Sequence, residues 1–409
     1  MFKECMNKKK LLFVIHRLGA GGAEKSLVSL LNALPSDMFE IDLLAIDPSG
    51  IFLKQVPPAI KVLEPPREMV CMSVKITDKR FWQCATLKLL LVKLRCILGN
   101  HLRGGGSKAR RSHSQYYNDI WQKHIPNLGF KYDVAISYID GLNYYVIDHV
   151  TAGKKILWCH NDYNKLEFNP SYDHRYYEKA DKICTISELC RKSLIENFPD
   201  LKDRFEVIEN ISSPMMINVQ ADMCDEMESA KDGFTLDKRF KIVSIGRLTE
   251  QKGFDFAIDA AVVLKNRGLE FCWYILGEGP LRKAVESAIQ AKGISDNIKF
   301  IGIRANPYPY IKRSDVFVMP SRYEGKSIAL DEAKILHKPI VVTDYPSVYD
   351  AVENKITGLI VKMNGESIAS GIQQLHDDAM LRDALTSELD KHNYGNEKQV
   401  ISSFLALIR

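Results

Sequence analysis

The sequence lacks several features that mark metal sites, membrane spans and serine hydrolases. No two aspartates stand two positions apart, so the D-x-D motif that binds a metal and a diphosphate is absent, and no G-x-S-x-G stretch occurs. Nine cysteines are scattered without metal-ligand spacing, which favours reduced, mostly buried thiols in a cytosolic protein. The apolar run near the N-terminus ends at His16 and is too short to span a membrane. We therefore expect neither a resident metal nor a membrane-spanning helix.

Excess positive charge is confined to one segment. The 409-residue chain has a formal net charge of only +5, yet Lys75–His113 holds ten Lys and Arg against one acid, Asp78. Within it, residues 79–98 mix cations with many leucines, which is typical of a basic amphipathic helix on an anionic membrane surface. Nucleic acid is not expected, because aromatic residues are sparse and no nucleic-acid motif is present. The alternative is an ordinary packed helix whose lysines reach solvent.

Apolar runs alternate with helical stretches in both halves of the chain. Apolar strands separated by helices indicate a parallel sheet that is covered on both faces. The pattern stops over residues 219–239, which are polar and acidic and which we interpret as a linker. The sequence therefore predicts an α/β chain with two doubly wound domains, residues 1–218 and 240–394. Ligands bind such sheets beyond the carboxyl ends of the strands.

A glycine-rich turn follows the first predicted strand. In GAGGAE, Gly19–Glu24, backbone NH groups can bind a phosphate or let a substrate approach closely. The dinucleotide-binding fingerprint needs a glycine where this chain has Glu24, so a dehydrogenase is disfavoured. A tight strand-to-helix turn without a ligand explains the motif equally well.

A basic loop follows the first strand of the second predicted domain. In GRLTEQKG, Gly246–Gly253, Arg247 and Lys252 stand at the carboxyl edge of the sheet. Arginine binds phosphate as a planar fork and lysine binds it as a point charge. Two fixed cations would hold a diphosphate without a metal. A solvated basic loop is the alternative, but the flanking glycines and the strand-end position favour a function.

Two glutamates stand eight positions apart in SRYEGKSIALDEAK, Ser321–Lys334. A helical wheel puts Glu332 inside an apolar arc, where a carboxylate is costly unless it is paired. Glu324 precedes the helix start near Ser327, whose free NH groups attract anions. We expect the two carboxylates to bind sugar hydroxyls on either side of a phosphate. The alternative makes Glu332 a buried structural acid that is paired with a nearby base, and Glu324 a surface residue.

A histidine ends one strand of the first predicted domain. In WCHND, Trp158–Asp162, His160 is placed at the carboxyl edge of the sheet. There it could hydrogen-bond a substrate or carry a proton. A histidine that merely caps a strand end is the alternative.

Together these motifs resemble the retaining glycosyltransferases of family 4 over nearly the whole chain. The resemblance rests on GGAE, GRLTEQKG, LGEGP at Leu276–Pro280, the E-x7-E pair and a closing helix. It implies the GT-B fold, in which two doubly wound, Rossmann-like domains with parallel sheets face each other across a cleft. It also implies that the last helix, within residues 395–409, packs back on the first domain.

The resemblance assigns roles to individual residues. Arg247 and Lys252 would hold the donor diphosphate, Glu332 the ribose and Glu324 the transferred sugar, while the glycine turn and His160 would serve the acceptor. The residues assigned to catalysis are Glu324, Arg247, Lys252 and His160, and those assigned to ligand binding are Gly21, Gly22, Gly246, Gly277, Gly279, Ile303, Arg304, Lys326, Ser327, Ile328 and Glu332.

The implied reaction transfers a sugar from a nucleotide-diphosphate sugar, expected to be a UDP-sugar, to a hydroxyl of a lipid-linked saccharide. The anomeric configuration is retained and no metal is expected. Lys326 stands where the family often has an aromatic residue, and this EGKS form resembles bacterial enzymes that build capsule, exopolysaccharide and O-antigen chains. We expect a cytoplasmic protein, peripheral on the inner face of the cell membrane. The alternatives are a nucleotide-sugar epimerase of the same fold and a catalytically silent sugar-nucleotide-binding partner of another transferase.

Overall fold

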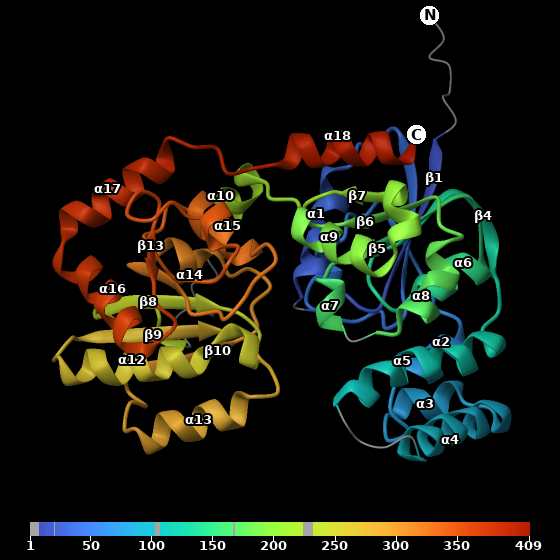
Figure 1. Cartoon of the computed structure of the whole chain (residues 1–409), viewed down its shortest axis with the longest axis horizontal. Helices are drawn as coiled ribbons and strands as arrows, with labels where there is room; N and C mark the ends of the chain where they lie inside the picture. The colour runs from blue at the N-terminus through green and yellow to red at the C-terminus, as the bar shows by residue number, and fades with distance from the viewer. Residues whose placement is uncertain (1–7, 20, 103–106, 167, 224–231) are drawn as a thin grey trace, which may run out of the picture. The chain divides into compact units, whose positions relative to one another are not determined.

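The computed structural model describes residues 8–19, 21–102, 107–166, 168–223 and 232–409, and within these the side chains outside 100–113 (Figure 1). The chain divides into two units. The first unit comprises Met1–Ile211 and Lys398–Arg409, and the second comprises Ser212–Glu397.

The first unit is built on a seven-stranded parallel sheet. Its strands are β1 (Lys9–Ile15), β2 (Phe39–Ala45), β3 (Lys61–Leu63), β4 (Leu128–Ser137), β5 (Val150–Cys159), β6 (Lys182–Thr185) and β7 (Phe205–Val207). They lie in the order β3-β2-β1-β4-β5-β6-β7. The chain therefore leaves β1 in one direction along the sheet and returns to continue in the other. This switch point lies between β1 and β4, which pair in parallel from Leu11 opposite Val134.

Helices cover both faces of this sheet. They are α1 (Gly22–Ala33), α2 (Arg67–Ser73), α3 (Lys79–Cys84), α4 (Leu87–Leu102), α5 (Ser107–Trp121), α6 (Asn143–His149), α7 (Tyr163–Leu166), α8 (Pro170–Tyr177), α9 (Glu188–Asn197) and α18 (Glu397–Ile408), with 3-10 turns at Leu53–Gln55, Gln122–His124 and Pro199–Arg204. Successive residues of a strand point to opposite faces. Accordingly Leu12 and Val14 of β1 enter one apolar core, and Leu11 and Phe13 enter the other.

The last helix, α18, belongs to the first unit. Its Phe404 is fully buried and stacks on Phe13 of β1, with ring centroids 6.0 Å apart. Lys154 of β5 donates a hydrogen bond of 2.7 Å to the carbonyl of Leu407, near the end of the helix. A cation at this position satisfies a carbonyl that has no partner within the helix.

The second unit is built on a six-stranded parallel sheet. Its strands are β8 (Phe240–Ile245), β9 (Phe271–Leu276), β10 (Ile298–Gly302), β11 (Val316–Met319), β12 (Ile340–Thr343) and β13 (Leu359–Val361), in the order β10-β9-β8-β11-β12-β13. Its helices are α10 (Pro214–Asp222), α12 (Phe254–Asn266), α13 (Arg282–Ala291), α14 (Tyr308–Lys312), α15 (Ile328–Ile335), α16 (Gly365–Asp377) and α17 (Ala379–Asp390), with 3-10 turns at Glu250–Lys252 and Val348–Asp350. The sheet again separates two apolar cores. The prediction of parallel sheets covered on both faces is confirmed in both units.

The structure divides the chain earlier than the sequence pattern suggests. The division falls between Ile211 and Ser212, and α10 already belongs to the second unit. Part of the expected linker 219–239 is also structured, because Phe234 is buried between Tyr274 and Tyr310. Residues 224–231 of that stretch lie outside the described residues. Helix α10 buries only two side chains, Ile217 and Ala221, so its sequence lacks a clear apolar face that would mark a helix.

Candidate functional site

The second unit has its own switch point between β8 and β11, and the loops that follow these strands lie side by side. The backbone NH of Arg322 donates a hydrogen bond of 2.7 Å to the backbone carbonyl of Gln251. The Gln251 side chain donates one of 3.0 Å to the backbone carbonyl of Tyr323. The carboxyl edge of a parallel sheet at such a point is where ligands bind. The fold therefore brings together the two motifs that the sequence analysis selected in this half of the chain.

Lys252 and Glu324 form an ion pair at this switch point. Lys252 Nζ lies 2.6 Å from Glu324 Oε1, and Ser321 Oγ donates to the same oxygen over 2.6 Å. The Glu324 side chain is only 8% exposed, and Ser347 Oγ donates to its backbone carbonyl over 2.8 Å. The alternative that Glu324 is a surface residue is therefore wrong. A charge-assisted pair with an additional donor fixes both side chains in one geometry.

Arg247 is exposed beside this pair. In the part of the chain that the structure describes, its guanidinium has no hydrogen-bond or ion-pair partner. Gly246 precedes it, and a Cβ at that position would lie 3.2 Å from Cδ of Lys252. The glycine therefore leaves room for the lysine side chain to reach Glu324. The loop presents one cation that is already paired and one that faces solvent.

The N-terminus of α15 lies in the same loop region. Ser327 occupies the N-cap position in an extended conformation, but its side chain does not cap the helix. The first NH groups of a helix have no partner within the helix, so the turn at Ser327 and Ile328 offers donors to an anion. Lys326 precedes this turn and is half-buried.

Glu332 lies on the buried side of α15, as the helical wheel predicts. It is 2% exposed, and Tyr308 Oη of α14 donates to its Oε1 over 3.4 Å. One partner of Glu332 is thus a neutral hydroxyl on a neighbouring helix. A role toward a ribose stays a prediction.

Three glycines predicted to lie near the ligand have a packing role. A Cβ at Gly277, whose φ is +146°, would fall 2.0 Å from the carbonyl oxygen of Gly246, and one at Gly279 would fall 2.4 Å from that of Leu248. Leu248 NH also donates to the carbonyl of Glu278 over 3.1 Å. The loop after β9 therefore packs backbone to backbone on the loop that carries Arg247 and Lys252. Only glycine allows this approach.

Two further predicted residues follow β10. The Ile303 side chain is 40% exposed. Arg304 is instead held inside the unit, because its guanidinium lies 3.0 Å from Asp232 Oδ2 and donates to Tyr310 Oη over 3.3 Å. A role of Arg304 at a ligand would have to coexist with this ion pair.

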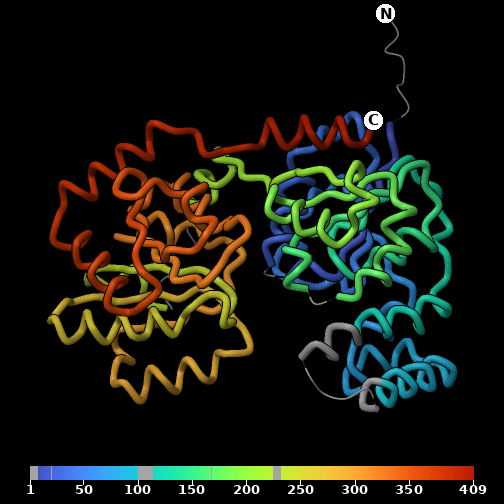
Figure 2. The backbone as a smooth tube through the Cα atoms, in the orientation of Figure 1, coloured from blue at the N-terminus to red at the C-terminus, as the bar shows by residue number. Residues whose placement is uncertain are grey.

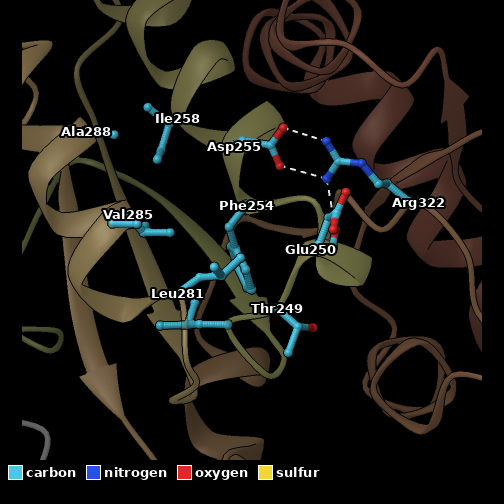
Figure 3. A pocket seen from close by; sticks show the side chains of 11 residues that line it. Thr249, Glu250, Phe254, Asp255, Ile258, Leu281, Val285, Ala288 and Arg322 are labelled. Carbon is cyan, nitrogen blue, oxygen red and sulfur yellow. Dashed lines mark hydrogen bonds and ion pairs between the residues drawn. The ribbon is translucent and has the colours of Figure 1, made fainter. Parts of the chain in front are cut away.

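A pocket of about 250 Å³ lies beside the loop after β8, between α12 and α13 (Figure 3). Its walls are mainly apolar, including Phe254, Ile258 and Val285. At the rim of the pocket, the Arg322 guanidinium donates two hydrogen bonds, of 2.8 and 2.6 Å, to the two carboxylate oxygens of Asp255. It donates a third, of 2.8 Å, to the backbone carbonyl of Glu250. These hydrogen bonds of Arg322 connect α12 to the loop that carries Lys252. None of the residues predicted to bind the donor lines this pocket.

In the first unit, the glycine turn opens α1. Gly21 is the N-cap and Gly22 is the first helical residue. A Cβ at Gly21 would lie 1.9 Å from Glu24 Oε2, so the glycine allows the glutamate to fold back over the helix start. Ala20 lies outside the described residues. The same Glu24 that breaks the dinucleotide fingerprint thus occupies the space beside the turn.

His160 follows β5 and packs among aromatic rings. Its ring lies 4.9 Å from that of Tyr138 and stacks on Trp158 at 6.0 Å. Burial lowers the pKa of His160 to about 3. The imidazole is therefore neutral at physiological pH. Both expected roles of His160, hydrogen bonding to a substrate and proton transfer, stay predictions.

Two polar residues at the β1/β4 switch point, His16 and Asp140, were not among the predicted site residues. His16 directly follows β1, and burial lowers its pKa to about 4. Asp140 follows β4 and accepts a hydrogen bond of 3.0 Å from Asn161, and burial raises its pKa. A Cβ at Gly141, whose φ is +91°, would lie 3.6 Å from His16 Nε2. The signal was present in their strand-end positions, but the adjacency of β1 and β4 is not readable from sequence.

The described residues include no group of three or more His, Cys, Asp or Glu that could hold a metal ion. Within the described ranges seven cysteines are free, and all but Cys84 are buried. Of the described helices, none has the length and apolar character needed to cross a membrane. Metal independence of any reaction stays a prediction.

Parts of the chain are similar to known glycosyltransferases. Residues 226–392, most of the second unit, match the family model described as Glycosyl transferases group 1. The chain is 30% identical over 158 residues to the alpha-D-kanosaminyltransferase of Streptomyces kanamyceticus, covering 38% of this chain and 41% of that protein. It is 27% identical over 241 residues to an N-acetylgalactosaminyltransferase of Campylobacter jejuni that is named for a diphospho-undecaprenol acceptor, covering 58% and 62%. The matched parts span less than two thirds of either relative.

Solved structures match the chain over almost its full length. Anabaena HepE in complex with UDP and glucose has a TM-score of 0.67 at 16% identity, with 98% of this chain and 99% of HepE covered. WaaG, a glycosyltransferase of lipopolysaccharide biosynthesis, has a TM-score of 0.61 at 14% identity, with 95% and 98% covered. Two Rossmann-like domains with parallel sheets of seven and six strands form the GT-B fold. The predicted fold class is confirmed.

Proposed function

We propose that this protein is a metal-independent, retaining glycosyltransferase of family 4. It transfers a sugar from a UDP-sugar to a hydroxyl of a lipid-linked saccharide during synthesis of a bacterial surface polysaccharide. The observation that carries the proposal is the Lys252–Glu324 pair at the β8/β11 switch point, with Arg247 exposed beside it and the start of α15 without a side-chain cap. The UDP complex of a structural neighbour and the undecaprenol-linked acceptor in a relative's name support the choice of substrates.

In this proposal the second unit stabilises the leaving diphosphate. As the bond from the anomeric carbon to the diphosphate oxygen breaks, negative charge grows on the diphosphate. Arg247, Lys252 and the NH groups at Ser327 and Ile328 would donate hydrogen bonds to that charge. The acceptor hydroxyl forms the new bond to the anomeric carbon on the same face. Its proton passes to an oxygen of the departing diphosphate, so no protein base is required.

The Lys252–Glu324 pair gives the donor two complementary contacts. Before the donor binds, each side chain neutralises the other. A diphosphate is a stronger partner for Lys252 because it carries more than one negative charge. When it takes up Lys252, Glu324 is released to accept hydrogen bonds from the transferred sugar. His160, Gly21 and Gly22 of the first unit are proposed to serve the acceptor, and Glu332, Ile303, Arg304 and Lys326 the nucleotide side.

The decisive experiment removes the cations one at a time. Lys252→Ala and Arg247→Ala should each lower turnover of the UDP-sugar by roughly a hundredfold or more, as loss of a donor to a developing oxyanion does. Lys283→Ala on α13, an exposed lysine of the same unit, is the matched control and should keep wild-type turnover. Near-wild-type turnover in Lys252→Ala would overturn the assignment of the diphosphate site.

Donor binding separates this proposal from its rivals. A panel of nucleotide sugars and free nucleoside diphosphates should include at least one compound that raises the melting temperature of the wild-type protein. An epimerase would convert that donor without any acceptor, whereas a transferase releases the nucleoside diphosphate only when acceptor is added. A catalytically silent binding partner would bind the donor but would not convert it, either with or without acceptor. Absence of any thermal shift would contradict the transferase proposal.

The site of action is proposed to be the cytoplasmic face of the cell membrane. The protein would be peripheral and would contact anionic lipid through Lys75–His113. Residues 103–106 of that segment lie outside the described residues, as do the side chains of 100–113. The side chains of the segment before residue 100 are described.

A further inference from the structure

Helix α4 has apolar side chains on two opposite faces. Leu89, Val92 and Cys96 are buried in the core of the first unit. On the other side of the helix, four leucines are 75%, 59%, 47% and 61% exposed, and they are Leu87, Leu91, Leu94 and Leu98. Steps of four, three and four residues place them on one line along the helix. We call these four residues the leucine stripe.

Such a stripe is unusual on a surface that stays in water. An outward helix face normally carries polar residues, and contiguous exposed apolar patches mark interaction surfaces. Ile97, which is 47% exposed, lies beside the stripe and widens it. Helices α3 and α4 lie at one end of the first unit, below α2 and α5 in the view of Figures 1 and 2.

Positive charge borders the stripe on one edge. Lys88 and Arg95, seven residues apart and both exposed, lie on the same side of it. Lys123 joins them in space, because Lys88, Arg95 and Lys123 all act on His124, whose pKa is lowered first by burial and then by these charges. The sequence of α4 contains no acid. The edge therefore presents cations without carboxylates from the same helix.

Not every cation of the segment contributes to this surface. Lys93 points into the unit, where its Nζ donates to the carbonyls of Cys71 and Met72 over 3.1 and 2.9 Å. Arg80 is paired with Asp78 and Asp47. The net charge of the segment is therefore larger than the unpaired positive charge that it exposes to a binding partner. The hydrogen bonds of Lys93 to α2 also fix the orientation of α4. That orientation keeps the leucine stripe outward.

We infer that the leucine stripe is a membrane-docking surface that inserts into the headgroup and acyl boundary of an anionic leaflet, with Lys88 and Arg95 on the lipid phosphates. Apolar insertion combined with basic flanks is the chemistry of interfacial helices. A second copy of this chain fits less well, because a self-complementary contact across a stripe without acids would bring like charges together. The inference deepens the proposed function and rests on it only where the acceptor is lipid-linked.

The docking helix is also connected to the β1/β4 switch point of the same unit. Helix α5 follows α4, and its Gln115 exchanges two hydrogen bonds of 3.2 and 2.9 Å with the backbone of Asn169. Asn118 of α5 donates to the carbonyl of Gly141 over 3.2 Å, next to His16. Insertion of α4 would therefore set the height of this switch point above the lipid surface.

The first test measures sedimentation of the full-length protein with vesicles of phosphatidylcholine alone and of phosphatidylcholine mixed with phosphatidylglycerol. Leu91→Ser/Leu94→Ser should lower the partition coefficient on mixed vesicles about tenfold or more, because two leucines no longer leave water. The matched control is Leu236→Ser/Met380→Ser, two apolar residues of the second unit that are 73% and 85% exposed. Its binding should equal that of the wild type. Unchanged binding of the stripe variant would overturn the inference.

The second test removes charge and keeps the stripe. Lys88→Gln/Arg95→Gln should weaken binding to mixed vesicles by roughly fivefold per charge, and added salt should reduce the difference. Binding to pure phosphatidylcholine should not change. If the wild type instead ignored both vesicles and light scattering showed a dimer that Leu91→Ser/Leu94→Ser dissociates, the stripe would be a contact between copies of this chain, and the inference would fall.

A third measurement separates this inference from the proposed function. Thermal protection by the UDP-sugar, and turnover with a water-soluble acceptor, should be the same in the stripe variant and the wild type. Loss of turnover only with acceptor embedded in vesicles supports the inference. A wild-type protein that docks on vesicles but binds no nucleotide sugar would contradict the transferase and leave the docking surface supported.

Discussion

At the scale of single residues, the most informative contact joins side chains that are 72 positions apart. The sequence marks Lys252 and Glu324 separately, one as a cation at a strand end and the other as an acid before a helix. That they pair at 2.6 Å follows from the adjacency of β8 and β11 in the sheet. Strand order is a tertiary property, so no local pattern predicts it. The motifs were readable from the sequence, and the family resemblance assigned both to one donor, but the direct Lys252–Glu324 ion pair was not predicted.

Two half-buried histidines of the first unit, His16 and His160, predict a pH dependence of stability. Burial holds the pKa of His160 at about 3 and that of His16 at about 4, below their value of about 6.5 in the unfolded chain. The unfolded state therefore binds protons first as the pH falls. Stability is fully present above about pH 6.5 and is lost as the pH drops toward the folded pKa values.

We expect each of these histidines to account for about 2 kcal/mol of the stability lost between pH 7 and pH 5. His160→Asn should therefore flatten the dependence of the unfolding free energy on pH relative to wild type, measured by denaturant titration. Asp173, whose pKa burial raises to about 6, acts in the opposite direction in both proteins. The difference between the two curves isolates the histidine. Parallel curves would contradict the assignment of a neutral ring.

At the scale of elements, the alternation of strands and helices was predictable because a parallel strand that is buried on both faces leaves a continuous apolar run. The helices between β3 and β4 were not predictable in the same way. The leucines of α4 serve two faces, so apolar periodicity cannot say which face is inside. Lys93 looks like a surface cation in the sequence, and only its hydrogen bonds to α2 reveal that it is buried.

The loop after β8 depends on a brace from the loop after β11. Arg322 holds Asp255 of α12 and the carbonyl of Glu250, on either side of Lys252. Arg322→Lys should raise the KM for the UDP-sugar and lower kcat by about tenfold, because an ammonium cannot reproduce the planar fork and misplacement of a binding group is costly. Steady-state kinetics would measure this change.

The control for this brace is another bonded arginine of the same unit. Arg267 follows α12 and contacts Glu366 and Gln373 of α16, away from the switch-point loops. Arg267→Lys should change stability slightly and leave the KM for the donor unaltered. Equal kinetic effects of the two substitutions would show that Arg322 acts through general stability and not through the position of Lys252.

At the scale of the whole molecule, the chain passes between its units twice, after Ile211 and after Glu397. The second passage returns α18 to the first unit, where Val400, Phe404 and Leu407 are buried. The stability of the first unit therefore depends on a helix that is synthesised after the entire second unit. The first unit can complete its core only when the last residues of the chain are present.

Phe404→Ala tests this dependence. Removing a fully buried aromatic ring that stacks on Phe13 should destabilise the first unit by about 3–5 kcal/mol, through lost burial and the cavity left behind. The second unit has separate cores and should keep its stability. Calorimetry should resolve two unfolding transitions in the variant, and UDP should shift only the one that belongs to the second unit. The contrary outcome is that UDP shifts both transitions equally, or that the variant shows a single transition at a lower temperature. Either result would mean that the two units unfold as one cooperative body. Helix α18 would then stabilise the whole chain.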